Sequence, residues 1–148
     1  MDYFIVELND EQKIAIPLDK VQEVMSINYN DICPIPGVKS GLLGVVSQRG
    51  NLLWLLDLSR LLLNFNSLTN RFNALTILVT KLEENYIGLV IKKLGEIKDS
   101  IIDNSLIVSE ENILNNYCQG IILDTQKQIP IIELSKIKSY VNELGVII

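Results

Sequence analysis

The chain contains no histidine among its 148 residues, and this absence limits the catalytic and metal-binding chemistry that it can perform. Histidine is the commonest general base and the commonest metal ligand, so histidine-dependent triads and imidazole metal sites are excluded. Lysine and arginine number 13 against 18 acidic residues, which gives a formal charge of −5. Nucleic-acid-binding modules usually carry a basic face. We therefore expect no nucleic-acid partner, no metal and no cofactor.

Cysteine and long apolar runs are also scarce. Cys33 and Cys118 are far apart and not in a metal-ligand spacing, so we interpret them as small apolar residues in or near the core. The most apolar stretch, 41–63, is interrupted by polar and charged residues, and no run approaches the roughly 20 apolar residues of a membrane helix. The first ten residues lack the features of a signal peptide. These patterns predict a cytoplasmic protein without direct membrane insertion.

What the chain does have is apolar side chains, at 48% of its residues, with 21% charged. This balance is typical of a folded domain and not of a disordered chain. A chain of this length buries roughly 70% of its extended surface on folding. We therefore expect a single domain over residues 1–148.

Two parts of the sequence repeat each other. The segment Gly44 to Leu62 aligns with Gly120 to Lys138, because each starts with glycine and two apolar residues and later reads acid-Leu-Ser-basic. Upstream, Ile5 to Val24 aligns with Leu78 to Ile97. The chain is thus predicted to contain two copies of one structural unit, in halves 3–65 and 74–142. The prediction allows the two halves to exchange strands or a helix.

Short β-rich segments separated by turns dominate both halves. The predicted strands are 3–8, 13–17, 43–47, 51–56, 75–81, 86–90, 117–123 and 128–132. Gly50-Asn51 is expected to form the turn of the 43–56 hairpin, and a helical or irregular step is expected after residue 90. This pattern predicts a mainly β protein made of two small barrels that share a hydrophobic interface.

Two short helices are predicted beside the strands. Apolar residues three and four apart from Leu18 to Met25 indicate an amphipathic helix that follows Pro17. A closing helix is expected after Ser135 as its N-cap. Its apolar face is formed by Leu134, Ile137, Val141 and Leu144.

Few residues are candidates for chemistry. Gly37 to Gly41 superficially resembles a phosphate loop, but its glycine spacing is wrong and no helix is expected there. Asp57 and Glu133 follow apolar strands and precede Leu-Ser, so we interpret them as helix caps and not as catalytic acids. Trp54 is either a core residue or an exposed anchor. Arg49, on a hairpin tip, is either a solvated turn charge or a group that binds a partner carboxylate.

Two motifs taken together make the chain resemble a known family. Val21-Gln22-Glu23-Val24 is followed by Gly44 to Gly50, reading GVVSQRG, and then by Leu55-Leu56-Asp57-Leu58. This order is similar to the CheW-like adaptor domain of bacterial chemosensory systems, and the resemblance extends from Tyr3 to about Val141. It implies two intertwined five-stranded barrels of SH3-like form with short helices.

The resemblance also implies a function without catalysis. CheW-like proteins are scaffolds that couple the cytoplasmic tips of methyl-accepting chemoreceptors to the regulatory domain of a CheA-type histidine kinase, in taxis or type IV pilus motility. Matched by position, the partner-binding residues are those of the hairpin and of the preceding Val-Gln-Glu segment, together with glycines expected beside a groove where receptor helices dock. These residues are Arg49, Gly50, Gln48, Gly44, Val21, Glu23, Gly88, Gly120 and Trp54.

The sequence departs from the family pattern at two places. Ser47-Gln48 stands where the family has Asn-Leu, and Leu53-Trp54 stands where it has Ile-Pro. Trp54 could thus anchor a specific partner. Two other functions stay open at this point: a small-molecule sensor that uses the groove between the halves, and a degenerate enzyme or nucleic-acid-binding barrel.

Overall fold

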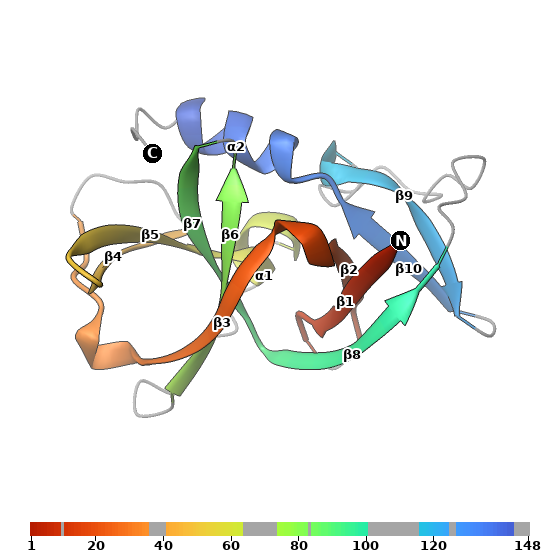
Figure 1. Ribbon diagram of the computed structural model, residues 1–148, viewed down its shortest axis with the longest axis horizontal. Helices are drawn as coiled ribbons and strands as arrows, with labels where there is room; N and C mark the ends of the chain where they lie inside the picture. Colours follow the sequence, from red (N-terminus) through yellow and green to blue (C-terminus); the bar gives the residue numbers. More distant parts are fainter. Residues whose placement is uncertain are drawn as a thin grey trace.

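The computed structural model places the chain in two five-stranded sheets and two helices (Figure 1). It describes residues 1–9, 11–35, 41–63, 74–82, 84–100, 116–124 and 127–143. The strands are β1 (Asp2–Glu7), β2 (Lys13–Pro17), β3 (Val21–Asn28), β4 (Leu42–Gln48), β5 (Asn51–Asp57), β6 (Ala74–Leu82), β7 (Asn85–Ile91), β8 (Lys93–Asp99), β9 (Cys118–Asp124) and β10 (Lys127–Ile132). The helices are α1 (Leu58–Leu63) and α2 (Leu134–Glu143), with short 3-10 helices η1 (Leu18–Lys20) and η2 (Tyr29–Asp31).

Each sheet is assembled from both halves of the chain. The sheet that contains β1, here the β1 sheet, has the order β8-β1-β2-β10-β9, and the sheet that contains β6, here the β6 sheet, has the order β3-β6-β7-β5-β4. The first hairpin of one half is thus completed by the last three strands of the other. The exchange ties the two halves together, because neither sheet can be completed within its own half.

The two sheets are built to the same plan. Replacing each strand by its counterpart in the other half converts one strand order into the other. The registers agree too, since β10 joins β2 with Ile131 opposite Ala15, and β5 joins β7 with Leu55 opposite Gly88, both in parallel. These are the residues that the repeat alignment places over one another. The mainly β fold with two five-stranded units, expected from the sequence, is confirmed.

The prediction of a helix from Leu18 to Met25 is wrong. A single 3-10 turn, η1, is followed by the strand β3, which pairs antiparallel with β6 along its length. Pairing sets a period of two, so Val21, Glu23 and Met25 are less exposed than their neighbours, whereas Val24 is 42% exposed. The apolar residues of this segment are spaced as in an amphipathic helix only by coincidence. Pairing with β6 determines that the segment forms a strand. The helical or irregular step expected after residue 90 is likewise a strand, β8.

Two local predictions are also corrected. The turn between β4 and β5 consists of Arg49 and Gly50, with φ of 50° and 80°, and Asn51 already belongs to β5. Positive φ at both loop residues is typical of the tight hairpin turns that match strand twist. Helix α2 begins at Leu134, so Ser135 lies inside its first turn and is not the N-cap. Leu144 lies outside the described residues.

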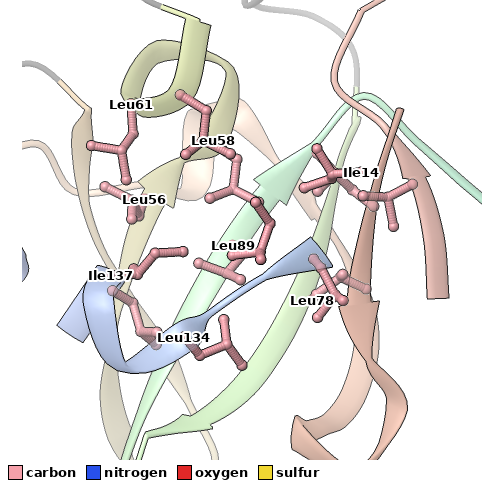
Figure 2. Packing of buried hydrophobic residues seen from close by; sticks show 14 of the residues in the cluster. Ile14, Leu56, Leu58, Leu61, Leu78, Leu89, Leu134 and Ile137 are labelled. Atoms are coloured by element: carbon pink, nitrogen blue, oxygen red, sulfur yellow. The ribbon is translucent and has the colours of Figure 1, made fainter. Parts of the chain in front are cut away.

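The largest hydrophobic cluster lies between the sheets and confirms the shared interface (Figure 2). The β1 sheet contributes Ile14 and Ile16, the β6 sheet contributes Leu78 and Leu89, and both helices add leucines and an isoleucine. Each fully buried side chain of this kind contributes about 2–3 kcal/mol relative to exposure. Helix α2 lies above β6 and β7 in Figure 1 and completes the cluster with Leu134, Ile137 and Val141.

Asp57 caps helix α1, as expected from its position. Its Oδ1 accepts hydrogen bonds from the backbone N–H groups of Ser59 at 3.1 Å and Arg60 at 3.4 Å. The hydroxyl group of Ser59 in turn donates a hydrogen bond to the carbonyl oxygen of Leu8 at 2.7 Å, which joins α1 to the residue that follows β1. Because Asp57 is only 2% exposed, burial raises the pKa of its carboxyl group to about 6, against the opposing effect of these bonds.

Gly44 allows a close backbone approach. Its φ is +140°, and a Cβ there would overlap the carbonyl oxygen of Cys33. Cys33 and Val45 exchange two backbone hydrogen bonds of 2.8 and 2.9 Å across this contact. The glycine is therefore required for the segment before β4 to pack on the sheet.

We predict that Gly44→Ala lowers the free energy of unfolding by about 3 kcal/mol or more, through steric overlap with the Cys33 backbone and the unfavourable φ. Gly50→Ala is the matched control, since Gly50 also has a positive φ but nothing lies within 4 Å of its added Cβ. That variant should lose only about 1 kcal/mol. Urea unfolding of both proteins measures the difference, and equal losses would contradict the packing role of Gly44.

The raised pKa of Asp57 predicts an unusual pH dependence of stability. The folded state holds the proton at higher pH than the unfolded state, where the pKa is 3.8. The free energy of unfolding should therefore fall, by about 2–3 kcal/mol, as pH rises from about 4 to about 6. Asp57→Asn keeps the capping oxygen without the charge, so this variant should lack that part of the decline. Urea unfolding across this pH range tests it, and parallel curves for the two proteins would refute it.

Candidate functional site

The tip of the β4–β5 hairpin is held against the edge strand β3 by polar side chains. The Gln48 side-chain amide donates to Glu23 Oε1 at 2.6 Å, and Arg49 Nη2 donates to Glu23 Oε2 at 3.2 Å. Both carboxylate oxygens of Glu23 are thus used. The positive φ at Arg49 and Gly50 turns the hairpin tightly enough to bring these side chains to β3. The tip and the strand edge form one polar cluster, here called the tip cluster.

Within the tip cluster, Arg49 faces outward. Its side chain is 78% exposed, against 28% for Glu23. A guanidinium has five N–H donors in a fixed plane. One of its NH₂ groups is bound to Glu23, which orients the group and leaves other donors directed at solvent. Such a geometry suits a carboxylate on a partner surface, with which arginine makes paired, charge-assisted hydrogen bonds.

A hollow of about 530 Å³ lies beside the tip cluster, here called the tip hollow. Besides Glu23, Gln48 and Arg49, its lining includes three large apolar or aromatic side chains, Leu52, Trp54 and Tyr86. Leu52 is 71% exposed and Tyr86 is 42% exposed. The surface thus combines an oriented cation with exposed apolar area, the composition expected of a protein-binding patch.

Trp54 serves both the core and this surface. On β5, Leu53 and Leu55 face the hydrophobic cluster on one side of the β6 sheet, and Trp54 lies on the other face. There it is half-buried, packs against the inter-sheet cluster, and reaches the tip hollow. Trp54 is therefore partly a core residue and partly a surface residue, and its role as an anchor stays a prediction.

The structure brings some of the predicted site residues together and separates others. The structure brings together Glu23, Gln48, Arg49, Gly50 and Trp54 around the hairpin tip. Val21 lies two residues before Glu23 on β3 and is half-buried against the inter-sheet cluster. The other three, Gly44, Gly88 and Gly120, lie away from the tip.

Gly88 is not beside a groove, contrary to the expectation. It is buried in β7, where an added Cβ would come within 2.6 Å of Leu55 and 2.8 Å of Ile77. Gly44 is buried beneath Cys33 for the reason given above. Both glycines are required by the packing around them. Gly120 lies on β9 in the β1 sheet and is half-exposed.

Sequence reasoning missed Leu52 and Tyr86. Leu52 looked like another apolar strand residue, and Tyr86 follows a turn in the other half of the chain. Only the pairing of β5 with β7 brings them to the same surface. The alternation of β5, which buries Leu53, is the one signal that could have indicated an exposed Leu52.

The tip cluster has no arrangement for bond-making chemistry. Among the described residues, no group of three cysteine or acidic side chains is close enough to hold a metal ion. Burial raises the pKa of the Cys118 thiol to about 11, which is the opposite of what a reactive thiolate needs. The part of the chain that the structure describes also holds no helix long and apolar enough to cross a membrane.

Comparison with known proteins agrees with this geometry. The family model of the CheW-like domain matches residues 2–141. The fold is similar to that of the scaffolding protein TtCheW from Thermoanaerobacter tengcongensis, with a TM-score of 0.74 at 19% sequence identity, covering 90% of this chain and 84% of that one. No curated protein sequence matches the chain. The family match, which includes the tip cluster, is decisive: the chain belongs to the CheW-like domain family, whose members are non-enzymatic scaffolds of chemotaxis signalling.

Proposed function

We propose that this chain is an adaptor that couples the cytoplasmic tip of a chemoreceptor to the regulatory domain of a CheA-type histidine kinase, in taxis or type IV pilus motility. The observation that carries the proposal is the oriented, 78% exposed Arg49 beside the tip hollow. Membership of the CheW-like family supports the choice of receptor and kinase as partners. The protein then works in the cytoplasm and is recruited to membrane-attached receptor arrays.

The tip cluster supplies the specific part of the contact. Arg49 binds an acidic side chain of the partner, while Glu23 and Gln48 hold it in place before binding. Preorganisation lowers the entropy lost when the complex forms. Gln48 stands where the family pattern has leucine, so the hydrogen bond that its side-chain amide donates to Glu23 is a departure of this chain from that pattern.

The tip hollow supplies the apolar part. Trp54 and Tyr86 are the residue types most often found as anchors in protein interfaces, and Leu52 adds exposed apolar area. A transient interface of this kind buries about 1,200 Å² or less and binds weakly on its own. Arrays with many copies then gain strength through multivalency.

A small-molecule sensor is the second candidate function. The tip hollow has a volume of about 530 Å³, within the range of about 300–1,000 Å³ typical of ligand pockets. It lies on the β6 sheet, and its lining includes residues of both halves of the chain. A ligand that raises the melting temperature in the absence of any partner protein would support this function.

We predict that Arg49→Glu weakens binding to the receptor tip or the kinase regulatory domain at least about tenfold, because it places a second carboxylate beside Glu23 and repels the partner's acid. The fold should persist, since an exposed ion pair contributes less than about 1 kcal/mol. Isothermal titration calorimetry with each purified partner measures the affinity, and circular dichroism checks the fold.

Lys13→Glu is the matched control for Arg49→Glu, because Lys13 is exposed at the start of β2 and the substitution changes the net charge equally. Its affinity for both partners should stay at the wild-type value. If Arg49→Glu binds both partners as well as wild type does, the tip cluster is not the contact.

A further inference from the structure

The tip hollow contains a charged side chain that the tip cluster does not use. Glu84, in the turn between β6 and β7, lines the hollow together with Arg49 and Glu23. Glu23 uses both of its carboxylate oxygens on Gln48 and Arg49. Glu84 is exposed, and it takes part in no ion pair within the described part of the chain. Among the described residues of the lining, Glu84 is thus the one carboxylate that is open to a partner.

Strand pairing places Glu84 near the hairpin tip. Strands β5 and β7 are parallel neighbours, with Trp54 opposite Ile87. Continued back to the residue before β7, this register sets Glu84 level with Asn51, two residues after Arg49. Neighbouring strands lie about 4.8 Å apart. The β4–β5 tip and the β6–β7 turn are therefore at the same end of the β6 sheet, where both line the tip hollow.

The charges of the lining indicate what Glu84 can select. Arg49 and Glu23 balance each other, because they form an ion pair of 3.2 Å. Glu84 is left as an unbalanced negative charge in the same hollow. A partner segment that brings only an acid to Arg49 is repelled by Glu84. A segment that also brings a basic side chain is attracted by both groups.

The hollow also offers apolar surface between its polar groups. Its lining includes Leu53 and Val79, which are each 4% exposed and belong to the hydrophobic cluster of the β6 sheet. An apolar side chain that enters the hollow therefore meets the edge of this cluster. Contact with it excludes water, and charge pairs beside a region without water are stronger than pairs in solvent.

We propose that Glu84 is a specificity-determining residue of the tip hollow, which binds a lysine or arginine of the partner while Arg49 binds an acid of the same segment. The inference rests on the proposed function and names the chemistry of the segment that docks there, which carries one acidic, one basic and one apolar side chain. Two opposite charges also fix the direction in which the segment lies, because the reversed direction sets like charges together.

The test measures the affinity of Glu84 variants of the full chain for the kinase regulatory domain and for the receptor cytoplasmic fragment, by isothermal titration calorimetry. Glu84→Gln should weaken binding to at least one partner about threefold to fivefold, and Glu84→Lys at least about tenfold. Glu84→Asp keeps the charge and should retain most of the affinity. The loss for Glu84→Gln should shrink as salt rises, because salt screens a pair near the surface.

Glu11→Gln and Glu11→Lys are the matched controls. Glu11 is exposed in the turn between β1 and β2, which the sequence repeat aligns with the turn of Glu84, and it does not line the hollow. These variants change the net charge equally and should bind as wild type. Circular dichroism checks that every variant folds.

Three results would overturn the inference. Wild-type affinity of Glu84→Gln for both partners would show that the carboxylate makes no contact. Tighter binding of Glu84→Gln would show that Glu84 only repels the acid of the partner. Equal losses for the Glu11 variants would show an effect of net charge alone. In each case a tenfold loss for Arg49→Glu leaves the proposed function standing, whereas wild-type binding of Arg49→Glu contradicts the proposed function itself.

Discussion

The fold depends on the burial of one apolar cluster between two sheets that exchange strands. Ile14 and Ile16 from the first hairpin meet Leu78 and Leu89 from the second, and α1 and α2 close the ends. Because a half of some 65 residues is marginal alone, this shared burial stabilises both halves together. The pseudo-symmetric strand orders follow from the same constraint, since each hairpin is completed by the other half.

The tip cluster and the tip hollow, which we propose as the partner-binding surface, are placed by this arrangement. The β4–β5 hairpin joins the β6 sheet through the parallel pairing of β5 with β7, and this pairing brings Tyr86 to the same surface as Trp54. The edge strand β3 then supplies Glu23, which orients Arg49. In the proposed function, the core holds the side chains that contact the partner in position.

Much of this could be predicted from local patterns. The bounds of β2 and the capping role of Asp57 were predicted, because turn residues and an acid before Leu-Ser are local signals. The segment 18–25 was predicted wrongly, because its apolar spacing fits a helix and only pairing with β6 makes it a strand. Gly88 was misinterpreted for a similar reason, since its packing against Leu55 depends on the exchanged strand. Where a local sequence pattern fits more than one structure, pairing between strands that are distant in the sequence determines which one forms.

The central claim is that the chain acts through the outward face of the β4–β5 hairpin and the adjacent β3 edge. Hydrogen–deuterium exchange of the chain with and without the regulatory domain of its CheA-type kinase, and separately with a receptor cytoplasmic fragment, tests this most directly. The account predicts slower exchange at residues 21–23 and 48–54 with at least one of these partners. Protection confined to the β1 sheet with both partners would contradict it.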